Sequence, residues 1–252
     1  MQKLGTSLAA LVVAAPVWAS EPASPDPGTS PIPSATQQLL VVRSPSWKSV
    51  TATLQRFERT AGASWQAQGA VIAVNVGRNG MAWGRGLQPK DEPGPVKKEG
   101  DQRTPAGAFP LGPAFGYHDA LPAGAKRYPY VHVQRGISCI EDQKSKYYNQ
   151  VIDLGSVTKG DWSRTDDMLR ADGLFRWGII VDQNAKDTLP GAGSCVFLHI
   201  WRGPKQGTAG CTAMAPEAIE ETIRWLDPAA RPVLVQLPES EYTRLRPEWA
   251  LP

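Results

Sequence analysis

Glycine and proline interrupt this chain at short intervals along its whole length. The 252 residues include 24 glycines and 23 prolines, a larger share than globular proteins usually contain. Either residue weakens or breaks the interior of a helix, so a bundle of long helices is excluded. The favoured architecture is a set of short strands joined by turns.

The charged residues argue against one large class of partners. The formal net charge is +3, and the lysines and arginines are scattered along the chain. A nucleic-acid-binding protein usually gathers its basic residues on one face. We therefore expect no nucleic-acid partner, and we expect the protein to be a monomer.

The first residues have the pattern of a secretory signal. Lys3 precedes a short apolar stretch, and small residues lead up to a cleavage point after Ala19. The apolar stretch is too short to span the hydrocarbon core of a membrane. We expect a periplasmic or secreted protein without a membrane span. The predicted organisation is a signal peptide over 1–19, a proline-rich disordered tether over 20–36 and a folded domain over 37–252.

Hydrophobic patterning predicts mostly strands in the folded domain. Apolar runs rich in β-branched residues predict strands over 38–43, 69–76, 81–86, 104–111, 130–134, 150–153, 177–182, 194–201 and 232–237. Helical spacing of apolar residues predicts helices over 47–60 and 216–226, with one helical turn at 166–170. Since βαβ alternation is absent from this pattern, we expect a mostly β fold with two or three helices.

A histidine and a cysteine close together give the strongest chemical signal. His199 is expected to end a strand, and Cys211 follows a glycine-rich turn at 207–210. A cysteine nucleophile needs a base, because a free thiol has a pKa of about 8.5, and a nearby histidine can be that base. Glycines in the turn let a substrate carbonyl and backbone N–H groups approach closely. This pattern fits thiol acyl transfer.

Two other interpretations of the same residues stay open. Cys211 and His199 are also compatible with a structural role in a packed core. A zinc site would use Cys195, His199, Cys211 and His132 as ligands. Zinc is disfavoured because the chain lacks the usual CxxC and HExxH spacings, and because exported thiols tend to oxidise.

The segment from His199 to Cys211 resembles the active-site signature of the L,D-transpeptidase catalytic domain, the YkuD-like family. That signature is a histidine, a spacer and then Ser/Thr-x-Gly-Cys, and here the chain reads TAGC over 208–211. Upstream, RTPAGAF over 103–109 resembles the family's T-P-x-G-x-F strand entry. GRNG over 77–80 resembles the turn before it. The resemblance covers about residues 70–237.

The resemblance implies an L,D-transpeptidase-like β-sandwich and a cysteine acyltransferase. Cys211 would attack the carbonyl of an L,D-peptide bond in a peptidoglycan stem peptide, and His199 would take the thiol proton. The Ile200 carbonyl would orient the other ring nitrogen of His199. Gly210 and Cys211 would offer N–H groups to the oxyanion, and Thr208 would help to position them. No metal or organic cofactor is implied.

The chain departs from the family pattern around the cysteine. The spacer between His199 and Thr208 has eight residues, fewer than in typical members. Thr212 and Ala213 follow the cysteine, where typical members have an aliphatic residue and then an arginine or asparagine that helps to hold substrate. Arg202 or Lys205 is a candidate replacement for that charge, and His132 is a further candidate substrate contact.

The remaining cysteines can be paired in a way that spares the nucleophile. If Cys211 is catalytic, a disulfide between Cys139 and Cys195 is the pairing that leaves it free, and two reduced buried thiols are the alternative. Near Cys139, Glu141 and Asp142 are interpreted as surface carboxylates.

The expected function is therefore L,D-transpeptidation of peptidoglycan stem peptides by an exported enzyme of cell-wall biosynthesis. A hydrolase on the same scaffold, an L,D-carboxypeptidase or an amidase, differs only in the acceptor of the acyl group. A non-catalytic cell-wall-binding domain is the alternative from another class of protein.

Overall fold

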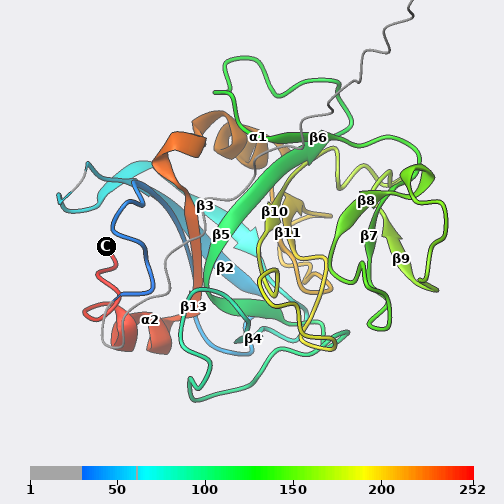
Figure 1. The fold of residues 1–252 in the computed structure, drawn as a ribbon. Coiled ribbons are helices and arrows are strands. Elements are labelled where there is room, and N and C mark those ends of the chain that lie inside the picture. Colours follow the sequence, from blue (N-terminus) through cyan, green and yellow to red (C-terminus); the bar gives the residue numbers. More distant parts are fainter. Residues whose placement is uncertain (1–29, 61) are drawn as a thin grey trace, which may run out of the picture.

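The computed structural model describes residues 30–60 and 62–252 (Figure 1). The predicted signal peptide and the first part of the predicted tether lie outside the described residues. The described part is mostly β with two α-helices, which confirms the predicted fold class.

The elements follow one another closely along the chain. The strands are β1 (Gln38–Ser44), β2 (Thr51–Glu58), β3 (Gln66–Asn75), β4 (Met81–Trp83), β5 (Thr104–Gly116), β6 (Tyr130–His132), β7 (Ile137–Ile140), β8 (Val151–Asp153), β9 (Thr165–Asp167), β10 (Trp177–Val181), β11 (Phe197–Ile200), β12 (Thr212–Met214) and β13 (Val233–Pro238). The helices are α1 (Pro216–Trp225) and α2 (Glu239–Leu245), with short 3-10 turns at Leu154–Ser156 and Pro228–Ala230.

Ten strands form one sheet that folds over a single core. Their order is β10-β11-β12-β3-β2-β1-β13-β5-β4, and β6 pairs with β5. The long strand β5 joins the two ends of this strand order. Its residues 107–110 pair with β13, and residues within 111–116 pair with β10. Leu40, Phe109 and Leu198 are fully buried in the hydrophobic core that this sheet encloses.

The two helices cover opposite ends of the large sheet. α1 begins with proline at its first turn and packs on β10 and β11, with Ile219 and Ile223 fully buried. This confirms the helix predicted over 216–226. α2 packs on β13 and β1 and was not predicted.

A second, small sheet has the order β8-β7-β9. Figure 1 shows it beside β10 and β11, on the side of the molecule away from α2. Its three strands are short, and each pair of neighbouring strands has three residue pairs in register. Its position therefore depends on contacts with the large sheet.

Two predicted helices are strands in the structure. The segment 47–60 contains β2, which pairs with β1 on one side and β3 on the other. Its buried residues, Ala52, Leu54 and Arg56, alternate with period two, and this pairing overrides the helical spacing of the apolar residues. The segment 166–170 overlaps β9, which pairs with β7.

The predicted tether is wrong in its described part. Ile32 is a member of the hydrophobic core, with 6% of its surface exposed, and Thr36 is fully buried. Ser30 Oγ donates a hydrogen bond to the backbone carbonyl of Trp249 at 2.7 Å. Residues 30–36 therefore belong to the folded domain, and the proline content of this stretch concealed that packing. Among the described helices, none is long and apolar enough to cross a membrane.

Candidate active site

A cleft of about 360 Å³ opens between the two sheets and contains both His199 and Cys211. One side of it, which we call the strand wall, consists of β11, β12 and the connection between them. The other side, the sheet wall, carries Glu141, Arg164 and Asp166 from the small sheet and its loops. The predicted catalytic pair is thus brought to one cavity.

The pairing of β11 with β12 places the histidine and the cysteine on the same face. The two strands are parallel neighbours, and His199 lies opposite Ala213 in their register. Side chains two residues apart along an extended chain point to the same side, so Cys211 shares its face with Ala213 and His199. All three line the cleft.

The Cys211 thiol is held by backbone groups on both sides. Sγ accepts a hydrogen bond from the Phe197 N–H at 3.4 Å, and the S–H donates to the Cys195 carbonyl at 3.6 Å. Burial raises the pKa of this thiol to about 12, and the Phe197 N–H offsets only part of that shift. The resting cysteine is therefore a neutral thiol.

The His199 ring is oriented for use as a base. Nδ1 lies 2.7 Å from the carbonyl oxygen of Ile200, so Nδ1 carries the proton that it donates there and Nε2 is left with a free lone pair. Phe175 packs its edge against the ring at 5.1 Å between centroids. Burial lowers the pKa of His199 to about 4, although the Ile200 carbonyl opposes this shift. Arg170, Asp172 and Arg202 supply the weaker charges around it.

Thr208 fixes the turn that presents the cysteine. Its hydroxyl donates to the Cys211 carbonyl at 2.5 Å and accepts the Gly210 N–H at 3.1 Å. The predicted oxyanion role of the Gly210 N–H is therefore not supported, because that donor is used within the turn. Gly210 instead supplies a backbone with φ of +150°, and a side chain there would lie 3.2 Å from the Arg103 carbonyl.

Thr104 is a site residue to which the sequence analysis gave no role. Its hydroxyl accepts the Gly77 N–H at 2.8 Å and donates to the Cys211 carbonyl at 3.0 Å. The side chain is fully buried, so it links the 77–80 turn to the nucleophile inside the protein. The signal was present as the threonine of the T-P-x-G-x-F resemblance, and the structure supplies the reason for that residue type.

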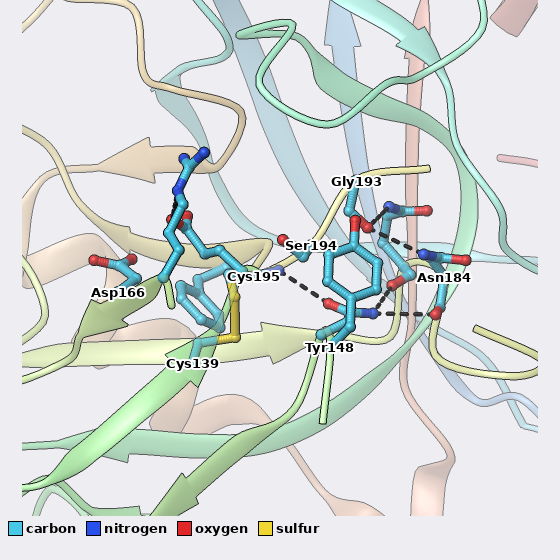
Figure 2. Close-up of a disulfide and its surroundings, with 12 residues drawn as sticks. Cys139, Tyr148, Asp166, Asn184, Gly193, Ser194 and Cys195 are labelled. Atoms are coloured by element: carbon cyan, nitrogen blue, oxygen red, sulfur yellow. Dashed lines mark hydrogen bonds and ion pairs between the residues drawn. A yellow bond between two sulfur atoms is a disulfide. The ribbon is translucent and has the colours of Figure 1, made fainter. Parts of the chain in front are cut away.

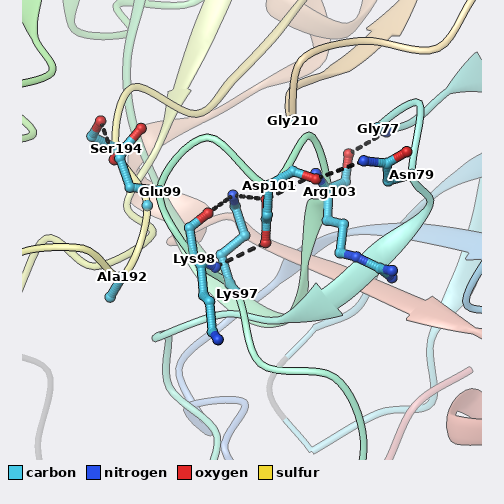
Figure 3. Close-up of polar contacts among 12 residues, drawn as sticks. Gly77, Asn79, Lys97, Lys98, Glu99, Asp101, Arg103, Ala192, Ser194 and Gly210 are labelled. Atoms are coloured by element: carbon cyan, nitrogen blue, oxygen red, sulfur yellow. Dashed lines mark hydrogen bonds and ion pairs between the residues drawn. The ribbon is translucent and has the colours of Figure 1, made fainter.

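The loop before Thr104 is organised around one carboxylate. Asp101 accepts hydrogen bonds from the backbone N–H groups of Lys98 and Arg103 and from the Lys97 ammonium at 2.5 Å. Figure 3 shows this set of contacts beside Gly77 and Gly210. The loop also lies against the turn that carries Cys211, because a Cβ on Gly210 would lie 3.2 Å from the Arg103 carbonyl oxygen.

A disulfide joins the small sheet to the segment that leads into β11. Cys139 of β7 and Cys195 are bonded, with their Cα atoms 5.9 Å apart (Figure 2), and Cys211 is the free cysteine. Cys195 has a φ of +54°, and its N–H donates to the side-chain oxygen of Asn149 at 2.9 Å. Because the Cys195 carbonyl accepts the Cys211 S–H, the disulfide also places the group that holds the thiol.

The disulfide also bears on the zinc alternative. Cys195 has no thiolate to offer while it is bonded to Cys139. Within residues 30–60 and 62–252, no group of three or more His, Cys, Asp and Glu side chains is arranged to hold a metal ion.

The weaker substrate-binding candidates are placed differently. Arg202 lines the cleft, but its guanidinium donates to Asp172 at 2.7 Å. His132 lies on β6 and, like Lys205, is not among the residues that line the cleft. The Nδ1 atom of His132 lies 3.1 Å from the side-chain nitrogen of Gln134.

The sheet wall is charged, which the sequence analysis missed. Glu141, interpreted there as a surface carboxylate, lines the cleft and accepts a hydrogen bond from Arg164 at 2.8 Å. Burial, followed by the charge of Glu141, raises the pKa of the Asp166 carboxyl to about 6. No local motif marks these residues, because β7 and β9 come together only in the folded chain.

Comparison with protein families agrees with this geometry. The family model of the L,D-transpeptidase catalytic domain, YkuD, matches residues 64–235, which include His199, Cys211 and Thr104. Since the match covers well over half of the chain, the protein belongs to this family. Among curated proteins, none matches the chain.

Proposed function

We propose that this member of the L,D-transpeptidase family is an exported cysteine acyltransferase that acts on peptidoglycan stem peptides. The observation that carries the proposal is the cleft in which a free thiol and a histidine with an unprotonated Nε2 share one face. The disulfide between Cys139 and Cys195 supports it further, because it leaves Cys211 as the free thiol.

The reaction begins from a neutral pair. Since burial raises the pKa of Cys211 and lowers that of His199, the proton moves from Sγ to Nε2 as the sulfur attacks the peptide carbonyl. For this step the S–H turns away from the Cys195 carbonyl, its resting acceptor. The Phe197 N–H stays on Sγ and stabilises the developing negative charge.

The tetrahedral intermediate then collapses to a thioester. Its oxyanion requires a donor close to Cys211, and the backbone N–H of Cys211 is the candidate that remains after Gly210 is committed to Thr208. The imidazolium of His199 returns its proton to the departing amine. An acceptor amine of a second stem peptide then attacks the thioester, and His199 takes the proton that this amine loses. The C–S bond breaks, and the Cys211 sulfur leaves and takes that proton back from His199, which restores the neutral pair.

Muropeptide analysis tests the proposal directly. Purified protein, without the predicted signal peptide 1–19, is incubated with muropeptides beside its Cys211→Ala variant, and the products are identified by mass spectrometry. New 3→3 cross-links in the wild-type reaction alone are the expected result. Shortened stems without cross-links indicate a hydrolase. Identical products from both proteins would contradict catalysis by Cys211 and favour a wall-binding role.

Export is part of the same proposal and has its own test. The mass of the protein recovered from the periplasm or medium of an expressing bacterium should correspond to a chain that begins at Ser20. Retention of the full chain in the cytoplasm would contradict it.

A further inference from the structure

Among the described residues, one cationic side chain that lines the cleft forms no ion pair. Four of the five lysines and arginines lining the cleft form ion pairs, with shortest N–O distances between 2.5 and 2.8 Å: Lys97 with Asp101, Arg164 with Glu141, and both Arg170 and Arg202 with Asp172. Arg78 is the fifth, and among the described residues it has no carboxylate within ion-pair distance.

The guanidinium of Arg78 keeps most of its donors free. Nε makes one long hydrogen bond to the Thr208 carbonyl at 3.4 Å. Within the described part of the chain, neither terminal nitrogen of Arg78 donates to a protein group. These two nitrogens form one edge of a planar fork that fits the two oxygens of a carboxylate. The residue is exposed, so a ligand in the cleft can reach it.

The backbone of Arg78 is fixed to the turn that carries the nucleophile. Its N–H donates to the Thr208 carbonyl at 2.9 Å, and the Thr208 N–H donates to the Val76 carbonyl at 2.9 Å. Gly207 packs so closely that a Cβ on it would lie 2.6 Å from the Arg78 Cα. Arg78 therefore starts from a fixed place relative to Cys211, although it is far away in sequence.

The other candidates for this role, as far as the structure describes the chain, are occupied or uncharged. Thr212 points into the core, where its hydroxyl hydrogen-bonds the Gln236 side chain. Ala213 lines the cleft but has only a methyl group. Arg202, the candidate from the sequence, is bound to Asp172.

We propose that Arg78 is a substrate-binding residue that recognises a carboxylate group of the stem peptide bound at Cys211. The inference rests on the proposed function, because it takes a carboxylate-bearing peptide as the ligand. Arg78 touches the substrate but not the reacting bond, so its loss lowers the affinity for the peptide and leaves the thiol chemistry in place.

The test combines variants of the protein with variants of the peptide. Values of kcat/KM are measured for wild type, Arg78→Ala and Arg78→Lys, with Lys205→Ala as a matched control from the same region outside the cleft. The donor peptides carry carboxamides in place of their carboxylates, one position at a time. A charge-assisted hydrogen bond of the usual strength predicts a loss of about 10- to 100-fold for Arg78→Ala. Arg78→Lys, which keeps the charge without the fork, should lie in between.

The pattern across peptides identifies the interaction. With wild type, one carboxamide peptide should show the same loss, and with Arg78→Ala that peptide should be no worse than its parent. Equal losses for Arg78→Ala with every peptide, or an effect no larger than that of Lys205→Ala, would overturn the inference.

A binding measurement separates this inference from the proposed function. Calorimetric titration of the intact stem peptide into Cys211→Ala protein, with and without Arg78→Ala, needs no turnover. Loss of Arg78 should raise the Kd for the peptide by about 10- to 100-fold. That result supports the inference even if no transfer occurs. An unchanged Kd, or no binding to either protein, contradicts it. Binding without any acyl transfer by the wild type contradicts the proposed function alone.

Discussion

The two walls of the cleft are built from different chemistry. The strand wall holds His199 and Cys211 through backbone groups, and burial keeps both side chains uncharged at neutral pH. The sheet wall presents the ion pair of Glu141 with Arg164 and the carboxyl of Asp166, whose pKa is raised to about 6. A neutral pair suits proton transfer during attack, and a charged wall suits recognition of a polar peptide. Changes in the strand wall should therefore lower kcat, and changes in the sheet wall should mainly alter KM.

The largest effect should come from the base of the strand wall. His199→Ala removes the acceptor of the thiol proton, and kcat should fall by about 10²- to 10⁴-fold. Initial rates of cross-link formation measure this loss. His132→Ala, which changes a histidine outside the cleft, should retain the wild-type rate. A similar loss in both variants would show that the assignment of roles to the two histidines is wrong.

The pH profile of kcat tests whether the His199 ring is uncharged before the reaction begins. His199 acts as a base only when unprotonated, and burial lowers its pKa to about 4. The acid limb of kcat should therefore have its midpoint near pH 4, and below it the rate should fall about tenfold per pH unit. Circular dichroism at each pH confirms that the protein stays folded. A midpoint between pH 6 and 7 would mean that the ring is not desolvated in the enzyme–substrate complex.

Removing the disulfide should weaken the connection between the small sheet and the segment that leads into β11. The double variant Cys139→Ser, Cys195→Ser loses a native crosslink across 56 residues, and the free energy of unfolding should fall by about 2–5 kcal/mol. The Cys195 carbonyl should also lose its fixed place, so kcat and KM should change together. Urea denaturation and steady-state kinetics measure the two effects. Cys211→Ser keeps the crosslink and serves as the control, and equal stability of the two variants would count against this role.

Thr104→Val should disturb the strand wall by removing a buried hydroxyl that supports the Cys211 backbone. Valine matches threonine in shape but cannot accept the Gly77 N–H or donate to the Cys211 carbonyl. Leaving these buried groups without a partner should cost about 1–3 kcal/mol of stability and lower kcat, with KM nearly unchanged. Thr188→Val changes an exposed threonine and should do neither. An unaltered kcat in Thr104→Val would limit Thr104 to a role in stability.

The smallest effect should come from the sheet wall. Because burial raises the pKa of Asp166 to about 6, this carboxyl becomes charged as pH rises through that value. KM for the peptide should show a step of about fivefold or less near pH 6, and Asp166→Asn should abolish the step while kcat is retained. If the step persists in Asp166→Asn, another group is responsible for it.

The difference between the walls also explains which parts of the site can be found in the sequence. His199 and Cys211 are twelve positions apart, and a local motif describes them together with the turn between them. Glu141, Asp166 and Arg78 come from three separate segments that meet only when the sheets close. Arg78 lies in the GRNG turn that the family resemblance covers, but that turn gave Arg78 no binding role. The sequence neighbours of Glu141 and Asp166 give no sign of a cleft, so the sequence offered Arg202 and His132 instead.

The same division holds for the elements. Strands with continuous apolar runs, such as 177–182 and 232–237, were predicted within one or two residues of β10 and β13. β2 was predicted as a helix because the spacing of its apolar residues fits both the helical repeat of 3.6 residues and the two-residue repeat of a strand. Only its pairing with β1 and β3 selects the strand. β7 and β12 are too short to carry a pattern, and they exist because a neighbouring strand supplies their hydrogen bonds.

The amino-acid sequence by itself determined the class of fold, the family resemblance and the cysteine–histidine pair, since these depend on composition and on residues close together along the chain. The tertiary structure decided the protonation states of that pair, through burial. It also decided that the Gly210 N–H serves the turn and that Arg78, which lines the same cleft as the nucleophile, has no carboxylate partner within residues 30–60 and 62–252. These properties depend on which distant groups become neighbours, and long-range strand pairing and the disulfide fix those neighbours only in the folded chain.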